Sequence, residues 1–344
     1  PAPAPPAEPA VALVDWDQNG TSYNLSLVSA SARVLATAHA TWMRAARCGG
    51  VQAGIIEPPP ISTSNSRAYY LDGGVIRWLQ EDGKTGVAFA GPLDTGGSKA
   101  YGFAVAPSDS VFALNTIDYA GAPSAVTQRI TVTKVGASAL GAEIYSATST
   151  STAAIWPAGW RNGDLVLAYH GGTCTQGGGP GLTDAWSYHV VNAQTADRKI
   201  TVGSDARPGC GFVGDPTPAG VPCGSYLDTT GHGQTQILDW TGATRDSRPG
   251  ALLKGGLSPD GVHYLGNYGT GSVALYGPQG QTVYVSAGTC YSCAVGWIDD
   301  AHFIVAGTGD AGIRVYGTTN GDSGTPVNVK GDPLLRIPGG LDGA

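Results

Sequence analysis

The residues with the clearest chemical spacing are Cys290 and Cys293, a Cys-x-x-Cys pair of the kind found in redox-active dithiols and zinc sites. A zinc site of this type needs a second such pair, which the sequence lacks, and covalent haem attachment needs histidine at position 294, where alanine stands. The pair therefore predicts a disulfide, within this loop or to another loop, and indicates no metal and no cofactor.

A second candidate for metal binding is the segment Asp-Trp-Asp-Gln-Asn-Gly at 15–20. It begins like a calcium loop, because acidic and amide side chains alternate and a glycine allows a sharp turn. The twelfth position of such a loop should be glutamate, and here it is Ser26. The segment therefore predicts a polar hairpin turn after a strand, with no metal.

Residues for enzymatic catalysis are sparse. The sequence contains no Gly-x-Ser-x-Gly motif, and its histidines are too scattered to assemble a catalytic triad from sequence alone. Glycoside hydrolysis requires two facing carboxylates, and Glu57 and Asp215 are the acidic residues best placed on candidate inner strands. We predict no catalytic residue. If the protein were an enzyme, Glu57 and Asp215 would be its candidate catalytic pair.

The composition indicates many short strands. Glycine and proline supply 53 and 23 of the 344 residues, and the glycines separate apolar runs rich in Val, Ile, Tyr and Trp. The net charge of −7, with no basic run, argues against a nucleic-acid partner. No uninterrupted apolar stretch is long enough to span a bilayer as a helix, which takes about 18 residues.

The strands repeat as two alternating hairpins. The first, built around a Pro/Asp/Asn/Gly turn, occurs at 61–72, 103–114, 157–170, 255–266 and 295–307, with a degenerate copy at 210–230. The second has a polar turn and occupies 23–38, 76–89, 130–147, 187–203, 235–255, 272–288 and 313–331. Together they make four-stranded units of roughly 40–55 residues, which is the size of a propeller blade.

The ends of the sequence complete the pattern. The first unit has only three strands, within 10–17 and 23–38, and the segment Leu-Leu-Arg-Ile-Pro-Gly at 334–339 can supply the missing inner strand. Exchange of a terminal strand removes the open sheet edges of a radial array. We therefore predict an all-β fold: residues 10–344 form a single β-propeller of about seven four-stranded blades, closed by the N- and C-terminal strands. A two-domain β-sandwich is the alternative.

One hairpin carries a family resemblance. The sequence Leu-Ser-Pro-Asp-Gly at 257–261, with weaker echoes at 107–110 and 297–300, resembles the TolB-like, WD40-like repeat of bacterial exported propellers. The resemblance covers the repeat architecture of most of the chain. A Trp-Asp pair occurs at 16–17 but does not recur at blade spacing. The resemblance implies a binding or scaffolding surface, but the fold alone does not fix the function.

Two features indicate export. Residues 1–9 are rich in proline and alanine, so we expect a disordered, extended tether like those that follow a signal peptide or a lipid-attachment cysteine. A cloning remnant or an ordinary disordered terminus is the alternative. Because the sequence starts at Pro1 and its only methionine is Met43, we expect a processed N-terminus. Six cysteines fit an oxidising compartment, so we expect a secreted or surface protein, with a lipid anchor upstream of Pro1 as one route.

The propeller prediction also suggests disulfide pairs. The loop between the second and third strands of a blade shares a face with the loop that leads to the next blade. Cys174 lies in the former kind of loop and Cys210 in the latter, so we predict a Cys174–Cys210 bridge, together with Cys290–Cys293. A Cys210–Cys223 bridge is the alternative. Two cysteines keep no assigned partner, Cys48 and Cys223.

The same loops predict a binding rim on one face of the ring. The polar residues expected there are Asp17, Asp118, His170, His232, Tyr268 and Asp310. They can hydrogen-bond a polar partner and include no evident nucleophile–base pair. A further candidate contact is Trp42 with Arg44 and Arg47, in the long connection before the second blade, as an exposed anchor of an interface.

These observations favour a binding or scaffolding module for a protein or carbohydrate partner. The alternatives are a propeller enzyme, such as a lyase, lactonase or glycoside hydrolase with its site at the funnel mouth, and a structural subunit of a surface assembly.

Three tryptophans on or beside inner strands are expected to pack between blades, with their indole N–H groups bound to backbone acceptors: Trp156, Trp160 and Trp297.

Overall fold

The computed structural model describes residues 7–42, 53–55, 58–91, 93–94, 97–122, 125–149, 153–171, 174–176, 185–205, 212–224, 234–249, 251–268, 271–278, 280–290, 294–307, 312–319 and 324–342. For 53–55, 174–176, 212–213, 249, 251–254, 267–268, 271–272 and 280–290 the description covers the backbone alone. All of the regular elements in these ranges are β-strands, and no helix in them could cross a membrane.

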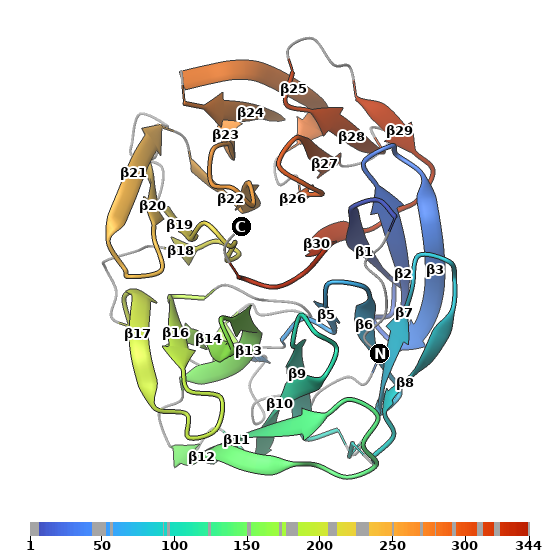
Figure 1. Cartoon of the computed structure of the whole chain (residues 1–344), viewed down its shortest axis with the longest axis vertical. Coiled ribbons are helices and arrows are strands. Elements are labelled where there is room, and N and C mark those ends of the chain that lie inside the picture. Colours follow the sequence, from blue (N-terminus) through green and yellow to red (C-terminus); the bar gives the residue numbers. More distant parts are fainter. Residues whose placement is uncertain are drawn as a thin grey trace.

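The strands form seven four-stranded antiparallel sheets arranged as blades around a central axis (Figure 1). Blade 1 contains β1 (Ala10–Trp16), β2 (Ser22–Ser29), β3 (Val34–Thr41) and β30 (Asp332–Ile337). Blade 2 contains β5 (Ile61–Thr63), β6 (Ala68–Asp72), β7 (Val75–Leu79) and β8 (Thr85–Phe89). Blade 3 contains β9 (Lys99–Val105), β10 (Val111–Gly121), β11 (Ala125–Lys134) and β12 (Ala142–Ser149).

The remaining blades follow in chain order. Blade 4 contains β13 (Ala154–Arg161), β14 (Asp164–His170), β16 (Ser187–Val191) and β17 (Arg198–Gly203). Blade 5 contains β18 (Phe212–Val213), β19 (Val221–Gly224), β20 (Gln234–Leu238) and β21 (Thr244–Pro249). Blade 6 contains β22 (Ala251–Leu257), β23 (Tyr264–Tyr268), β24 (Gly271–Gly277) and β25 (Gly280–Cys290). Blade 7 contains β26 (Ala294–Trp297), β27 (His302–Ala306), β28 (Ile313–Gly317) and β29 (Thr325–Val327).

The ring closes by strand exchange, as the sequence predicted. β30 is the innermost strand of blade 1 and pairs with β1, with Ala10 opposite Ile337 and Ala12 opposite Leu335 (Figure 1). The strand begins two residues earlier than expected, at Asp332, and ends at Ile337, because Pro338 has no N–H to continue the ladder. The prediction of an all-β, seven-bladed propeller is therefore confirmed.

One hairpin boundary was wrong. The second hairpin expected over 235–255 ends at Pro249, and residues 251–257 form the inner strand of the next blade. The apolar run that starts at Ala251 reads as a β-strand, as do the two strands of the hairpin before it. Periodicity alone therefore could not separate the two blades there.

Tryptophans join neighbouring blades, and this prediction is confirmed for two of them. The indole of Trp160 in blade 4 donates to the carbonyl oxygen of Ala104 in blade 3 at 2.9 Å. The indole of Trp297 in blade 7 donates in the same way to Gly256 in blade 6, also at 2.9 Å. Both side chains are buried. Each therefore fills the space between two sheets with its polar atom satisfied.

Acidic residues in the first-hairpin turns also link blades. The carboxylate of Asp109 in blade 3 accepts hydrogen bonds from the hydroxyls of Ser66 (2.7 Å) and Tyr69 (2.5 Å) in blade 2. The carboxylate of Asp300 in blade 7 accepts a bond from the Asp260 amide in blade 6 at 3.0 Å. The recurring turn aspartates of the sequence thus connect adjacent blades.

The two faces of the ring differ in their connections. On the first, here called the turn face, the described strands are joined within blades by at most seven residues, as in 214–220 between β18 and β19. The opposite face is here called the long-loop face. At this face the second strand of each blade ends and the third begins, and the last strand of one blade ends and the next blade begins; in sequence, β3 and β5 are separated by 42–60 and β14 and β16 by 171–186.

Two of the long connections pair with each other. β4 (Ala53–Ile55), between blades 1 and 2, forms a two-stranded antiparallel sheet with β15 (Cys174–Gln176), within blade 4. The sequence did not predict this sheet. It joins the connection between blades 1 and 2 to the connection within blade 4.

Candidate functional site

Four of the six predicted rim residues are described by the structure, and these four lie on the long-loop face, at connections between second and third strands. Asp17 lies in the β1–β2 turn, and Asp118, His170 and Tyr268 lie at or near the ends of β10, β14 and β23. Two members of the predicted rim lie outside the described residues, His232 and Asp310. The structure thus places the four described members on one face, in four different blades, and their part in binding stays a prediction.

Three of these side chains have local contacts. The carboxylate of Asp17 accepts bonds from the Thr21 hydroxyl (2.8 Å) and amide (2.7 Å), and these bonds lower the pKa of Asp17 to about 2. The carboxylate of Asp118 accepts a bond from the Ala120 amide at 2.9 Å. His170 is buried against the ring of Trp186, with 5.1 Å between ring centroids. The segment 15–20 thus ends β1 and begins the polar hairpin turn that leads to β2.

Trp42 is buried rather than exposed. Its side chain is 8% exposed and packs edge-on against Trp16, with ring centroids 5.1 Å apart, and against Tyr23. The residue directly follows β3, so its ring folds onto the aromatic side chains of β1 and β2. Its predicted companions Arg44 and Arg47 lie outside the described residues.

A groove opens on the long-loop face where blades 1 and 7 meet. This seam groove encloses about 820 Å³ and is lined by the ends of β1 and β27, the start of β28 and the connection from β29 to β30. Asp15, Asn328 and Lys330 line it, and their side chains form no hydrogen bond or ion pair to any residue that the structure describes. The partly buried side chain of Val329 also belongs to its lining. Sequence reasoning missed this groove, because its walls come from opposite ends of the chain.

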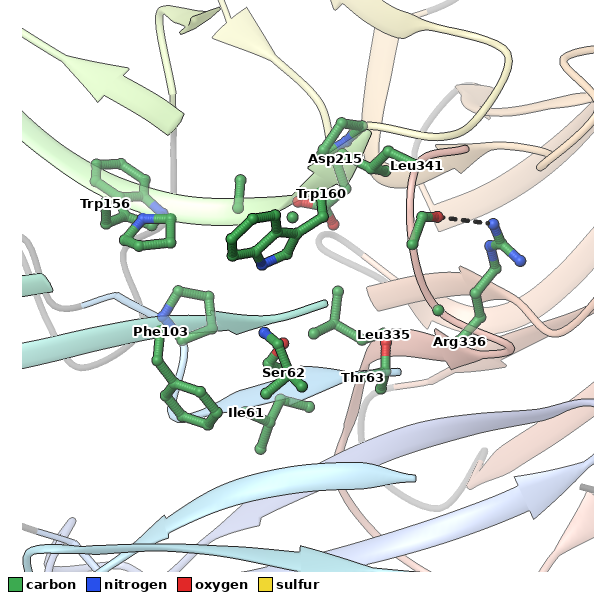
Figure 2. A pocket seen from close by; sticks show the side chains of 18 of the residues that line it. Ile61, Ser62, Thr63, Phe103, Trp156, Trp160, Asp215, Leu335, Arg336 and Leu341 are labelled. Atoms are coloured by element: carbon green, nitrogen blue, oxygen red, sulfur yellow. Dashed lines mark hydrogen bonds between the residues drawn. The ribbon is translucent and has the colours of Figure 1, made fainter. Parts of the chain in front are cut away.

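A cavity of about 100 Å³ lies among the inner strands β5, β9, β13 and β30, and its lining includes the aromatic residues Phe103, Trp156, Trp160 and Tyr188 (Figure 2). Asp215 is the one carboxylate among the described lining residues of this cavity. Its predicted catalytic companion Glu57 lies outside the described part of the chain.

A serine, a histidine and an aspartate meet in blade 4, a grouping that the sequence did not reveal. The Nε2 atom of His189 lies 3.2 Å from the hydroxyl of Ser187 and 2.7 Å from the carboxylate of Asp205. In a catalytic triad the acid holds Nδ1 and the nucleophile contacts Nε2. Here one nitrogen serves both, and Ser187 and His189 are at most 1% exposed, so we assign the group to the core.

This core group predicts a dependence of stability on pH. Burial lowers the pKa of His189 below its ordinary value of 6.5, although Asp205 partly offsets this effect. The unfolded chain therefore binds a proton near pH 6.5 that the folded chain resists, so stability falls as the pH drops below that value. The variant His189→Gln cannot titrate at this position. Between about pH 7 and about pH 5, we expect its free energy of unfolding to fall by on the order of 1 kcal/mol less than that of the wild type.

Urea unfolding at several pH values measures this difference. The matched control is His39→Gln, at an exposed position in β3. We expect the control to follow the wild-type curve. A His189→Gln curve that runs parallel to the wild type over this range would contradict the assignment.

Of the six cysteines, the structure describes the side chain of one. Cys223 is buried and forms a disulfide. The side chains of the other five lie outside the described part of the chain, so its partner is not assigned. The Cys174–Cys210, Cys290–Cys293 and Cys210–Cys223 bridges stay predictions. Among the described residues, no group of three His, Cys, Asp or Glu side chains could hold a metal ion.

The fold and its faces define this chain as a seven-bladed β-propeller. No protein-family model matches the chain, and no curated protein matches its sequence significantly. Among solved structures it is similar to BBS1N, in a complex with ARL6DN, with 12% identity, a TM-score of 0.46, and 90% and 89% of the two chains covered. It is also similar to the AfRom2 CNH domain, with 7% identity, a TM-score of 0.41, and coverages of 92% and 96%.

A third similar structure is prolyl oligopeptidase B from Galerina marginata, bound to a 35mer hydrolysis and macrocyclization substrate. The identity is 8% and the TM-score 0.45. The match covers 87% of this chain and 46% of the oligopeptidase, so this chain spans less than half of that protein. At these identities and scores, none of the three similarities indicates an activity or a partner for this chain.

Proposed function

We propose that this chain is a binding module that holds a protein partner on its long-loop face and turns over no substrate. The observation that carries the proposal is the seam groove on the same face as the longest connections. Long loops on a rigid scaffold are where binding residues concentrate.

The chemistry of the groove suits a protein surface. Asp15 and Lys330 supply both signs of charge without a described partner, Asn328 adds an amide, and Val329 offers apolar area. Protein interfaces combine an apolar centre with a polar, partly charged rim. A carbohydrate would also use polar groups of this kind, and the tests below distinguish it from a protein.

The enzyme alternative has less support among the described residues. Ser187 and His189 are too deeply buried to meet a substrate, and Asp215 lies in a cavity of only about 100 Å³. As part of the same proposal, we infer that the protein acts outside the cell. This rests on the Pro/Ala-rich residues 1–9 and on the six cysteines. A TolB-like repeat and a lipid anchor upstream of Pro1 also remain proposals.

Blocking the groove should weaken partner binding. Asn328 is exposed in the groove, so Asn328→Trp fills it whatever charge the partner carries. The matched control is Leu140→Trp, at a residue that is 50% exposed in the β11–β12 turn of the turn face. We expect Asn328→Trp to retain a partner about tenfold less well than wild type or more weakly still, and Leu140→Trp to retain it unchanged.

The measurement is quantitative capture of proteins and glycans from extracts of the producing cells on each immobilised variant. A protein retained by wild type and by Leu140→Trp, and lost on Asn328→Trp, supports the proposal. Equal retention on wild type and both variants contradicts the proposal. A glycan that is retained by wild type and Leu140→Trp and lost on Asn328→Trp would show that the partner is a carbohydrate rather than a protein. Hydrolysis of chromogenic ester, lactone or glycoside substrates that disappears in Asp215→Asn would establish an enzyme instead.

A further inference from the structure

The segment that follows the closing strand lies across the mouth of the central channel. This strap, residues 338–342, leaves blade 1 after β30 and reaches blade 4 (Figure 1). The Gly339 amide donates to the carbonyl of Ser64 in blade 2 at 2.7 Å, and the Leu341 amide donates to the carbonyl of Trp160 in blade 4 at 2.9 Å. Blades distant in sequence thus hold the strap by its backbone, as a protein surface holds an extended peptide.

Leu341 occupies an apolar pocket in blade 4. Its side chain is 6% exposed and belongs to the same buried cluster as Trp156 (Figure 2). A Cβ atom added to Gly159 would lie 2.8 Å from one Leu341 methyl carbon. The glycine therefore provides the space that the leucine fills, so the pocket selects for an apolar side chain at this point of the strap.

The two strap glycines fit where no other residue would. A Cβ atom on Gly339 would lie 2.4 Å from the Thr63 hydroxyl oxygen and 2.6 Å from the Thr63 carbonyl oxygen. A Cβ atom on Gly340 would lie 2.7 Å from Pro107, and its φ of +96° is strained for any other residue. Walls from blades 2 and 3 therefore require glycine at both positions.

Polar groups of the ring bind the rest of the strap. The guanidinium of Arg336 donates to the carbonyls of Pro338 (2.7 Å) and Gly340 (3.2 Å). The backbone amide of Asn162 in blade 4 donates to the carboxylate of Asp342. Each of these donors lies outside the strap, so the ring supplies contacts to Pro338, Gly340 and Asp342 in addition to those to Gly339 and Leu341.

We propose that the turn-face mouth of the channel is a binding site for extended peptides of the pattern Gly-Gly-apolar-acidic, which the strap occupies in cis. An adjoining cavity of about 300 Å³, lined by Asn65, Asp300 and Arg336, leaves this mouth open beside the strap. A peptide of this pattern from another chain binds only after the strap leaves the mouth. This site lies on the face opposite the seam groove and does not depend on it.

The test uses the full chain and a fluorescent peptide, Pro-Gly-Gly-Leu-Asp-Gly-Ala, with the sequence of residues 338–344. In the variant Leu341→Asp the strap loses its apolar anchor, so the peptide gains access to the mouth. We expect this variant to bind the peptide about tenfold more tightly than wild type, or more, because a site occupied in cis binds weakly in trans. Gly340→Ala, which removes the strap by a clash with Pro107, should give the same result.

The double variant Gly159→Ala, Leu341→Asp is the matched control, because it fills the leucine pocket while the strap stays released. We expect it to bind the peptide no better than wild type, and a scrambled peptide to bind to none of the variants. The inference is overturned if both releasing variants, folded by circular dichroism, bind the peptide no better than wild type. The inference is also overturned if the double variant binds the peptide as tightly as Leu341→Asp does, or if the scrambled peptide binds as tightly as the peptide of residues 338–344.

Discussion

Deletion of residues from Leu334 onward should destabilise the protein by more than about 5 kcal/mol. The deletion removes Ile337, which is 2% exposed, and Leu334 and Leu335, which pack against the largest buried cluster. It also leaves Ala10, Val11 and Ala12 of β1 without their partners in β30. Exposed apolar edges of this kind cost both burial and hydrogen bonds, so the loss is a large fraction of the stability of a folded domain.

Thermal and urea unfolding of the shortened chain measure this loss. A chain that ends at Ile337 is the control, because it lacks the strap and keeps the closing strand. We expect the control to lose much less stability than the longer deletion. If the deletion from Leu334 melts at the wild-type temperature, the ring is not held closed by β30.

The second large effect is expected at Trp297. Replacement by alanine should cost about 3–5 kcal/mol, because it empties a buried site between blades 6 and 7. Replacement by phenylalanine keeps most of the buried area and loses the bond to Gly256, so it should cost about 1–3 kcal/mol. Urea unfolding of both variants separates the contribution of packing from that of the hydrogen bond.

Trp78→Ala provides a comparison in the same measurement. Trp78 is only partly buried, and the guanidinium of Arg67 covers its ring at 4.1 Å, so its removal opens no comparable cavity. We expect a smaller loss than for Trp297→Ala. A Trp297→Phe variant as unstable as Trp297→Ala would show that the hydrogen bond, rather than packing, joins these two blades.

The ring could be predicted from the sequence because its signals are local. Alternating apolar residues and turn aspartates such as Asp109 and Asp260 repeat at blade spacing, and an incomplete first unit requires an additional strand. The tryptophans of the inner strands were predictable for the same reason, since a large apolar ring with one donor has few suitable positions in a propeller.

The strap and the seam groove could not be predicted because they depend on contacts remote in sequence. Asn162 and Asp342 are 180 positions apart, and the strap glycines carry no periodic pattern. The paired strands β4 and β15 have three residues each, too few for a strand signal. Trp42 was placed in an exposed connection because the sequence does not show that the rings of Trp16 and Tyr23 lie beside it.

Hydrogen exchange of the chain in complex with its captured partner tests the proposed function most directly. The account predicts that the partner slows exchange on the long-loop face, in residues 15–16, 306–307 and 328–332, which line the seam groove. It also predicts unchanged exchange in the turn-face hairpins at 106–110 and 258–261. Protection confined to the turn face, with none in the groove, would contradict the proposal that this propeller binds through its long-loop face.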